Sequence, residues 1–190
     1  GEIYPYTVRY DGTYYLDGRK NWSDSIFEVV SELVNNGIIV YVNSYCKLSS
    51  NVYIHLLNKL KKLGKKCIVD VAPQKGDARK FFKIADATIW DVPAGGFIES
   101  WMSSTPAYSL SSVNLMRFQE DSKSYIDNLK SQGILCSSTI DLVNSILKLM
   151  KEGKIDIKTE SAVNKFLHKY TRTSNNWEKE WVNALKEKLN

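Results

Sequence analysis

The sequence has few cysteines and no long hydrophobic run. Its three cysteines, Cys46, Cys67 and Cys136, are widely spaced, and each lies in or beside an apolar run. We interpret them as reduced, buried thiols rather than a disulfide framework, which predicts a cytoplasmic location. The apolar runs, such as residues 38–42, are far shorter than the roughly 20 residues that a membrane-spanning helix requires. The sequence therefore indicates a soluble protein.

Several motifs of common enzyme classes are absent. The chain has no GxxxxGK[ST], which disfavours a Walker-type ATPase or kinase, and no GxGxxG, which disfavours a dinucleotide oxidoreductase. Because it has no zinc signature, HExxH or GxSxG, hydrolases of those kinds have no support. We interpret the two histidines, His55 and His168, as packed or surface residues of helical segments. We predict no metal and no cofactor.

The net charge is a modest +5, from 26 Lys and Arg against 21 Asp and Glu. This excess is compatible with an anionic ligand, with peripheral association with an anionic membrane, or with no more than solubility. We interpret a lysine run over residues 59–66 as the solvent-exposed side of a helix and the segment that follows it. Nucleic-acid binding would require a broader basic face with interleaved aromatic residues, so we predict no nucleic-acid partner.

The 190 residues, 43% of them hydrophobic and 25% charged, are enough for one globular domain. Short apolar runs alternate with segments of helical period, which is typical of βαβ units with a parallel sheet covered on both faces. We expect an α/β three-layer domain over residues 1–158 with a parallel sheet of about five to six strands. Residues 159–190 show two helical patterns without a strand between them, and these are expected to pack on the same domain.

The apolar runs and helical periods give boundaries for each expected element. Strands are predicted over residues 2–10, 38–42, 67–71, 87–92, 113–118 and 134–136. Helices are predicted over residues 24–36, 49–63, 80–84, 96–102, 121–131, 139–150, 160–170 and 177–189.

Ligands of open parallel sheets bind beyond the carboxyl ends of the strands, so the segments there are candidate sites. Residues 91–99 place Gly95 and Gly96 between a buried strand and the start of a helix. Free backbone N–H groups and the helix dipole favour an anion such as a diphosphate there, and Glu99 could accept hydrogen bonds from ribose hydroxyls. A tight turn also requires glycine, and the dipole alone favours a glutamate, so a structural role stays open.

The segment after the first predicted strand, residues 10–20, is a second candidate. Gly12 and Thr13 are small residues directly after a strand, and Arg19 and Lys20 are adjacent cations before a predicted helix. Such cations could neutralise phosphates, although surface arginines and lysines are commonly only solvated.

Residues 82–106, FKIADATIWDVPAGGFIESWMSSTP, resemble the donor-site region of GT-B glycosyltransferases, which typically has the pattern ADxxIxxPSxxGFxExMAxGxP. The residues in step with it are Ala85, Asp86, Pro93, Gly96, Phe97, Glu99, Met102 and Pro106. The opening of the chain resembles the loop in which these enzymes hold donor phosphates, and the end resembles their Trp-rich closing helices. Two departures are visible: Ala94-Gly95 stands where an acidic residue is common, and Gly12 is not in a glycine-rich run.

The resemblance implies a Rossmann-like, nucleotide-sugar-binding C-terminal domain of a GT-B glycosyltransferase that acts on a carbohydrate or other acceptor. Since such enzymes have two facing domains, it also implies an N-terminal domain in the full-length protein, and the start at Gly1 without Met favours such a piece. The catalytic base would lie on that other domain, so no catalytic residue is assigned. The implied donor-nucleotide site comprises Gly12, Thr13, Arg19, Lys20, Gly95, Gly96, Phe97 and Glu99.

Two alternatives stay open. The first is an enzyme similar to nucleoside deoxyribosyltransferases or TIR domains, in which Glu99 would act on an N-glycosidic bond. The second is a module that binds a partner and has no enzymatic activity.

Overall fold

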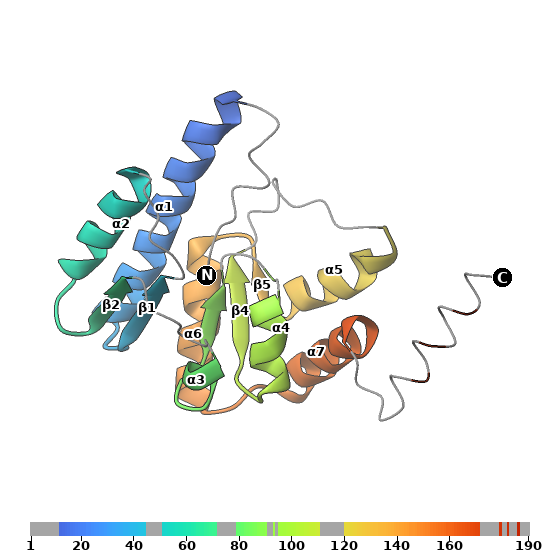
Figure 1. The fold of residues 1–190 in the computed structure, drawn as a ribbon. Coiled ribbons are helices and arrows are strands. Elements are labelled where there is room, and N and C mark those ends of the chain that lie inside the picture. Colours follow the sequence, from blue (N-terminus) through green and yellow to red (C-terminus); the bar gives the residue numbers. More distant parts are fainter. Residues whose placement is uncertain are drawn as a thin grey trace.

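The computed structural model describes residues 12–44, 51–71, 79–90, 93, 95–110, 120–171, 179, 182 and 186. It is an α/β structure in which helices alternate with short strands (Figure 1), as the alternating pattern predicts. The described elements are α1 (Gly12–Asn35), β1 (Val40–Ser44), α2 (Asn51–Lys61), β2 (Cys67–Val71), α3 (Arg79–Phe82), β3 (Thr88–Trp90), α4 (Gly95–Met102), β4 (Ala107–Leu110), η2 (Glu120–Ser122), α5 (Lys123–Ser131), β5 (Leu135–Cys136), α6 (Thr139–Glu152) and α7 (Ile157–Tyr170).

The described strands form two parallel sheets. One contains β1 and β2, with Val40 opposite Cys67, and the other has the order β3-β4-β5, with Thr88 opposite Ala107. From left to right in Figure 1, the strands follow the order β2, β1, β3, β4, β5. The described strands do not form the expected single sheet of five to six strands. The strands predicted over residues 2–10 and 113–118 lie outside the described residues.

Helices pack on both sides of the strands. α1 packs against β1, α2 and α6, while α2 contacts β2 and α6 contacts β4 and β5. α4 lies on β3 and β4, α5 lies on β5, and α7 packs against α4 and α5 (Figure 1). The second predicted closing helix, over residues 177–189, falls largely outside the described residues. Among the helices that are described, none has both the length and the apolar character needed to cross a bilayer.

Two hydrophobic clusters stabilise this arrangement. The larger lies around β3, β4 and β5 and includes Phe97, Leu142 and Phe166, while the smaller contains Leu60 beneath β1 and β2. Val40 packs against both clusters, so β1 joins them. Complete burial of one such large side chain contributes about 1.5–3 kcal/mol.

One boundary prediction was wrong, and one strand was not predicted. The first helix was expected from Asp24, after a loop that reached Lys20, but α1 begins at Gly12. Asp24 was expected to cap the helix, yet the helix continues back through Gly18, because one glycine inside a helix costs only about 1 kcal/mol, which is too little to end a helix whose later turns are buried. The strand β4 was not expected, because Ala107–Leu110 is short, follows a proline and contains a serine.

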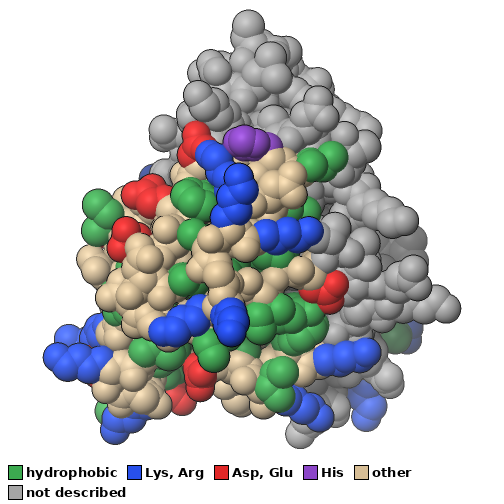
Figure 2. All heavy atoms as spheres, turned by 90° about the vertical axis from the view of Figure 1, so that its left-hand side faces the viewer, with side chains coloured by type: hydrophobic (Ala, Val, Ile, Leu, Met, Phe, Trp, Pro, Cys, Tyr) green, Lys and Arg blue, Asp and Glu red, His purple; other side chains and the backbone are tan. Residues whose placement is uncertain are grey.

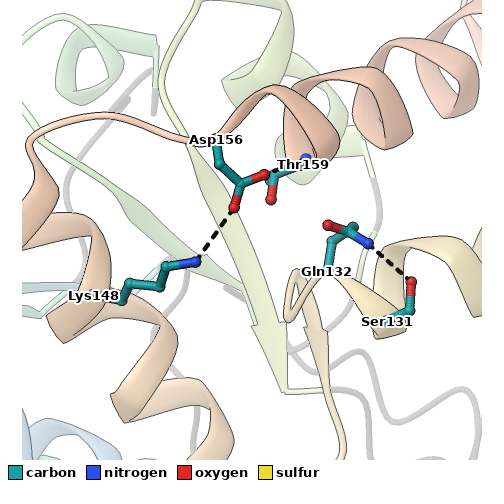
Figure 3. A network of polar contacts seen from close by, with 5 residues as sticks. All are labelled: Ser131, Gln132, Lys148, Asp156 and Thr159. Atoms are coloured by element: carbon teal, nitrogen blue, oxygen red, sulfur yellow. Dashed lines mark hydrogen bonds and ion pairs between the residues drawn. The ribbon is translucent and has the colours of Figure 1, made fainter.

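Side-chain caps fix the starts of the last two helices. Asp156 caps α7 by accepting the backbone N–H of Thr159 at 2.8 Å, and the Nζ of Lys148 lies 3.3 Å from its other carboxylate oxygen (Figure 3). The hydrogen bond from Thr159 is the main cause that lowers the pKa of Asp156, and Lys148 lowers it further. Ser138 caps α6 in the same way, accepting from the backbone N–H of Asp141 at 3.1 Å.

The cap at Asp156 predicts a stability change that depends on pH. We expect Asp156→Ala to lower the free energy of unfolding by about 1 kcal/mol at neutral pH, and Asp156→Asn, which keeps an acceptor, to lower it less. Because the folded-state pKa of Asp156 is depressed, this contribution is complete above the ordinary carboxyl pKa and is lost as the pH falls through the folded-state value. Urea denaturation at neutral and acid pH measures this, and an undiminished advantage of the wild type over Asp156→Ala in strong acid would contradict it.

Candidate functional site

The described part of the candidate site is the start of α4. β3 ends at Trp90 and α4 begins at Gly95, so this helix starts at the carboxyl end of a parallel strand. α1 precedes β1 in the same alternation, and Figure 1 shows that both helices begin on the side toward which the strands point. The start of α4 therefore lies at the edge where ligands of parallel sheets bind, whereas α1 begins well beyond the ends of the strands (Figure 1).

α4 has one exposed face and one buried face. Gly95 and Glu99 are exposed, and because they are four residues apart they lie one turn from each other on the same side of the helix. Phe97, Ser100 and Trp101 are buried on the other side. A ligand at the start of α4 would thus meet backbone N–H groups first and the Glu99 carboxylate one turn later.

Hydrogen bonds hold the buried face of α4 in place. The hydroxyl of Ser100 donates to the carbonyl oxygen of Thr105 at 3.0 Å and lies 2.8 Å from the Oγ1 of Thr88. The indole N–H of Trp101 donates to the carbonyl oxygen of Ala107 at 2.9 Å, and the hydroxyl of Thr105 donates to the carbonyl oxygen of Phe82. These bonds join α4 to both neighbouring strands and to α3.

The two glycines at the start of α4 have different surroundings. A Cβ at Gly96 would lie 2.2 Å from the ring of Trp90, whose indole N–H donates to the Oγ1 of Thr88 at 2.9 Å. A Cβ at Gly95 would meet nothing within 4 Å. Gly96 is therefore required for packing, whereas Gly95 faces open space.

Phe97 belongs to the core. Its side chain is 0% exposed and makes an edge-to-face contact with Phe166 of α7, with ring centroids 6.3 Å apart. This member of the predicted site therefore positions α4 and does not lie on its exposed face.

The remaining predicted residues belong to α1. Gly12 and Thr13 form its start, and Arg19 and Lys20 follow in its second and third turns, about 10–12 Å along the axis. Only the backbone of this part of α1 is described, so the predicted phosphate contacts of these four residues stay predictions.

Sequence reasoning missed a buried hydroxyl in β4. Ser109 is 0% exposed, lies opposite Trp90 in the sheet register, and its Oγ has no hydrogen-bond partner among the described residues. A buried hydroxyl without a partner costs about 1–3 kcal/mol, which makes this position unusual. No pattern in the sequence marks it, because the strand itself was not predicted.

The described cysteines are free and buried, as predicted, and Cys46 lies outside the described residues. Burial raises the pKa of the Cys136 thiol to about 11. Since the thiolate is the reactive form, Cys136 is a packing residue rather than a nucleophile at neutral pH. The described residues contain no group of three or more His, Cys, Asp or Glu side chains that could hold a metal ion.

Two hollows adjoin α7 rather than the start of α4. An open one of about 640 Å³ is lined by Tyr125 and His168, and another of about 460 Å³ by Trp101 and Leu167. The segments 45–50, 72–78 and 111–119, which follow strands at the carboxyl edge, lie outside the described residues. Comparison with family models, with curated proteins and with solved structures found no match to this chain.

The contrast between the two glycines predicts different costs for the same substitution. We expect Gly96→Ala to lower the free energy of unfolding by about 1–3 kcal/mol, because the new methyl group must displace the hydrogen-bonded Trp90 ring. The matched control Gly95→Ala should change it by less than about 0.5 kcal/mol. Chemical denaturation of both variants measures the difference, and equal stabilities would show that Trp90 does not restrict position 96.

Proposed function

We propose that this chain is the nucleotide-sugar-binding half of a GT-B-type glycosyltransferase and that the donor nucleotide binds at the start of α4. The observation that carries the proposal is the common exposed face of Gly95 and Glu99 on a helix that follows a parallel strand. The resemblance of residues 82–106 to a donor-site pattern supports the same placement.

The chemistry of this face fits the two polar parts of a nucleotide diphosphate. Unpaired backbone N–H groups and the positive end of the helix dipole favour the diphosphate near Gly95. Glu99, one turn later, is at about 5–6 Å along the helix surface, which suits hydrogen bonds from the neighbouring ribose hydroxyls. The buried face of α4 holds both positions through Ser100 and Trp101.

The proposed fold is a single doubly wound sheet of the Rossmann type. In the observed sheets β2 pairs with β1, and β3, β4 and β5 pair in that order, so one further strand between β1 and β3 would join the two sheets. A strand over residues 2–10, which the sequence predicts and which lies outside the described residues, would give this sheet the spatial order 3-2-1-4-5-6.

In the proposed reaction, the bond between the sugar's anomeric carbon and the donor phosphate breaks, and an acceptor hydroxyl forms the new bond. Negative charge then increases on the leaving nucleotide, where the α4 N–H groups and Arg19 or Lys20 would stabilise it. In this proposal a cytoplasmic N-terminal domain would hold the acceptor, a carbohydrate, together with the catalytic base. This chain alone is expected to bind nucleotides and turn over poorly.

Isothermal titration of the 190-residue chain with UDP, GDP, CMP and CDP tests the site. We expect at least one to bind, and Gly95→Asp to weaken that binding about tenfold or more, because it places a carboxylate beside the phosphates. The control Ile140→Asp adds the same charge in the first turn of α6, where the native side chain is 66% exposed, and should not change affinity. Absence of binding by all four at millimolar concentration would contradict the proposal.

Replacing Glu99 separates ribose recognition from phosphate recognition. We expect Glu99→Gln to weaken nucleotide binding by about 10- to 100-fold, because hydrogen bonds to a charged acceptor are lost, and to leave pyrophosphate binding unchanged. Competition of pyrophosphate against the bound nucleotide measures both effects. Release of a free base from NAD or a deoxynucleoside by the wild-type chain, abolished in Glu99→Gln, would instead favour N-glycosidic bond cleavage.

A further inference from the structure

Exposed isoleucines gather at the amino ends of three parallel strands. Ile39 directly precedes β1, Ile68 is the second residue of β2, and Ile84 precedes β3, with exposures of 69%, 48% and 78%. This is the edge opposite the proposed nucleotide site. A single large apolar side chain with this exposure is common on protein surfaces, but a group of them on one surface indicates an interaction site.

The sheet of β1 and β2 has one covered face and one partly open face. Val40 and Val42 pack with α2 in the smaller cluster, whereas Tyr41 and Ile68, which pair in register, lie on the opposite face. Parallel sheets are ordinarily covered on both sides. Among the described helices, the open face meets the four-residue α3, whose Phe81 stacks on Tyr41 at a centroid distance of 4.6 Å.

α3 brings the third isoleucine to this face. The backbone N–H of Ile84 donates to the carbonyl oxygen of Phe81 at 3.1 Å, so Ile84 lies in the turn that directly follows the residue whose ring covers Tyr41. The end of α3 therefore lies on the same face of the sheet as Tyr41 and Ile68.

Lysines lie close to these apolar residues in the chain, and the Asp70 carboxylate on the same face accepts the hydroxyl hydrogen of Tyr41 at 2.6 Å. Lys65 and Lys66 precede β2, and Lys80 and Lys83 belong to α3 and its exit; all four are exposed and form no ion pair with any residue that the structure describes. Lys148, by contrast, pairs with Asp156. Figure 2 shows lysine and hydrophobic side chains intermixed over the lower part of this side of the molecule, with a few acidic side chains among them.

We propose that this amino-edge patch, comprising Ile39, Tyr41, Ile68, Ile84, Lys65, Lys66, Lys80 and Lys83, docks on an anionic lipid surface. Separate apolar side chains that can enter the acyl boundary, near lysines that form no ion pair with a described residue, match a bilayer rich in acidic headgroups. A protein partner is less well matched, because charged residues are depleted from the cores of protein interfaces. Docking by this edge leaves the carboxyl edge of the sheet accessible.

Vesicle flotation tests the patch without any nucleotide, so its result is independent of the proposed function. The full chain should float with vesicles of phosphatidylcholine containing phosphatidylglycerol and should not float with phosphatidylcholine alone. Lys65→Glu/Lys66→Glu should reduce the partition coefficient by about 25-fold or more, from about fivefold per lysine. Ile39→Ser/Ile84→Ser should reduce it by about tenfold, because apolar contacts with the lipid are lost.

A matched control lies away from the patch. Ile140→Ser/Lys165→Glu/Lys169→Glu makes the same change in net charge and removes an isoleucine that is 66% exposed at the start of α6, and it should float like the wild type. Thermal unfolding of each variant verifies that these surface changes leave the fold intact. Equal loss in the control, equal binding to neutral vesicles, or loss of a wild-type oligomer in Ile39→Ser/Ile84→Ser without loss of flotation would overturn the proposal.

Discussion

A chain of buried hydrogen bonds around Ser100 determines where α4 lies, and the candidate site depends on it. The Ser100 hydroxyl has one hydrogen, which it donates to the carbonyl oxygen of Thr105, so Thr88 must donate to Ser100. Thr88 in turn accepts the indole N–H of Trp90, which fixes the ring that lies over Gly96. Each donor in this series of hydrogen bonds has an acceptor, and the series links β3 through α4 to the segment that precedes β4. These hydrogen bonds hold α4 through its buried face.

The elements that could be predicted from the sequence are those marked by continuous apolar runs or clear helical periods. The strand Cys67–Val71 was predicted with the observed boundaries, and the helix from Thr139 was predicted to within two residues of its end. β4 carries no such mark, because burial of Ala107 and Ser109 comes from the helix that lies over them. The hydrogen bonds of Thr88, Ser100 and Thr105 were equally invisible, since single hydroxyls have no period and their partners are set only by tertiary packing.

The residues of the candidate site divide into two groups that the sequence pattern could not separate. Gly96 and Phe97 match the glycosyltransferase-like pattern, yet the structure explains both by packing, against Trp90 and Phe166 respectively. Any short helix laid on a parallel sheet needs a close approach at its start and an aromatic or aliphatic side chain beneath it. A match at these positions therefore supports the fold more than the function. The functional proposal depends on Gly95 and Glu99, which share the exposed face of α4.

The polarity of parallel strands gives the two edges of this protein different chemistry. At the carboxyl edge helices begin, and their unpaired N–H groups favour anions; at the amino edge helices end, and their carbonyl groups favour cations. That second effect accounts for Lys59 and Lys61 in the last turn of α2. It does not account for Lys65 and Lys66, which lie beyond that turn and next to exposed isoleucines. A strand of five residues separates the two edges by about 16 Å, which is enough for one to meet a lipid surface while the other binds a small anion.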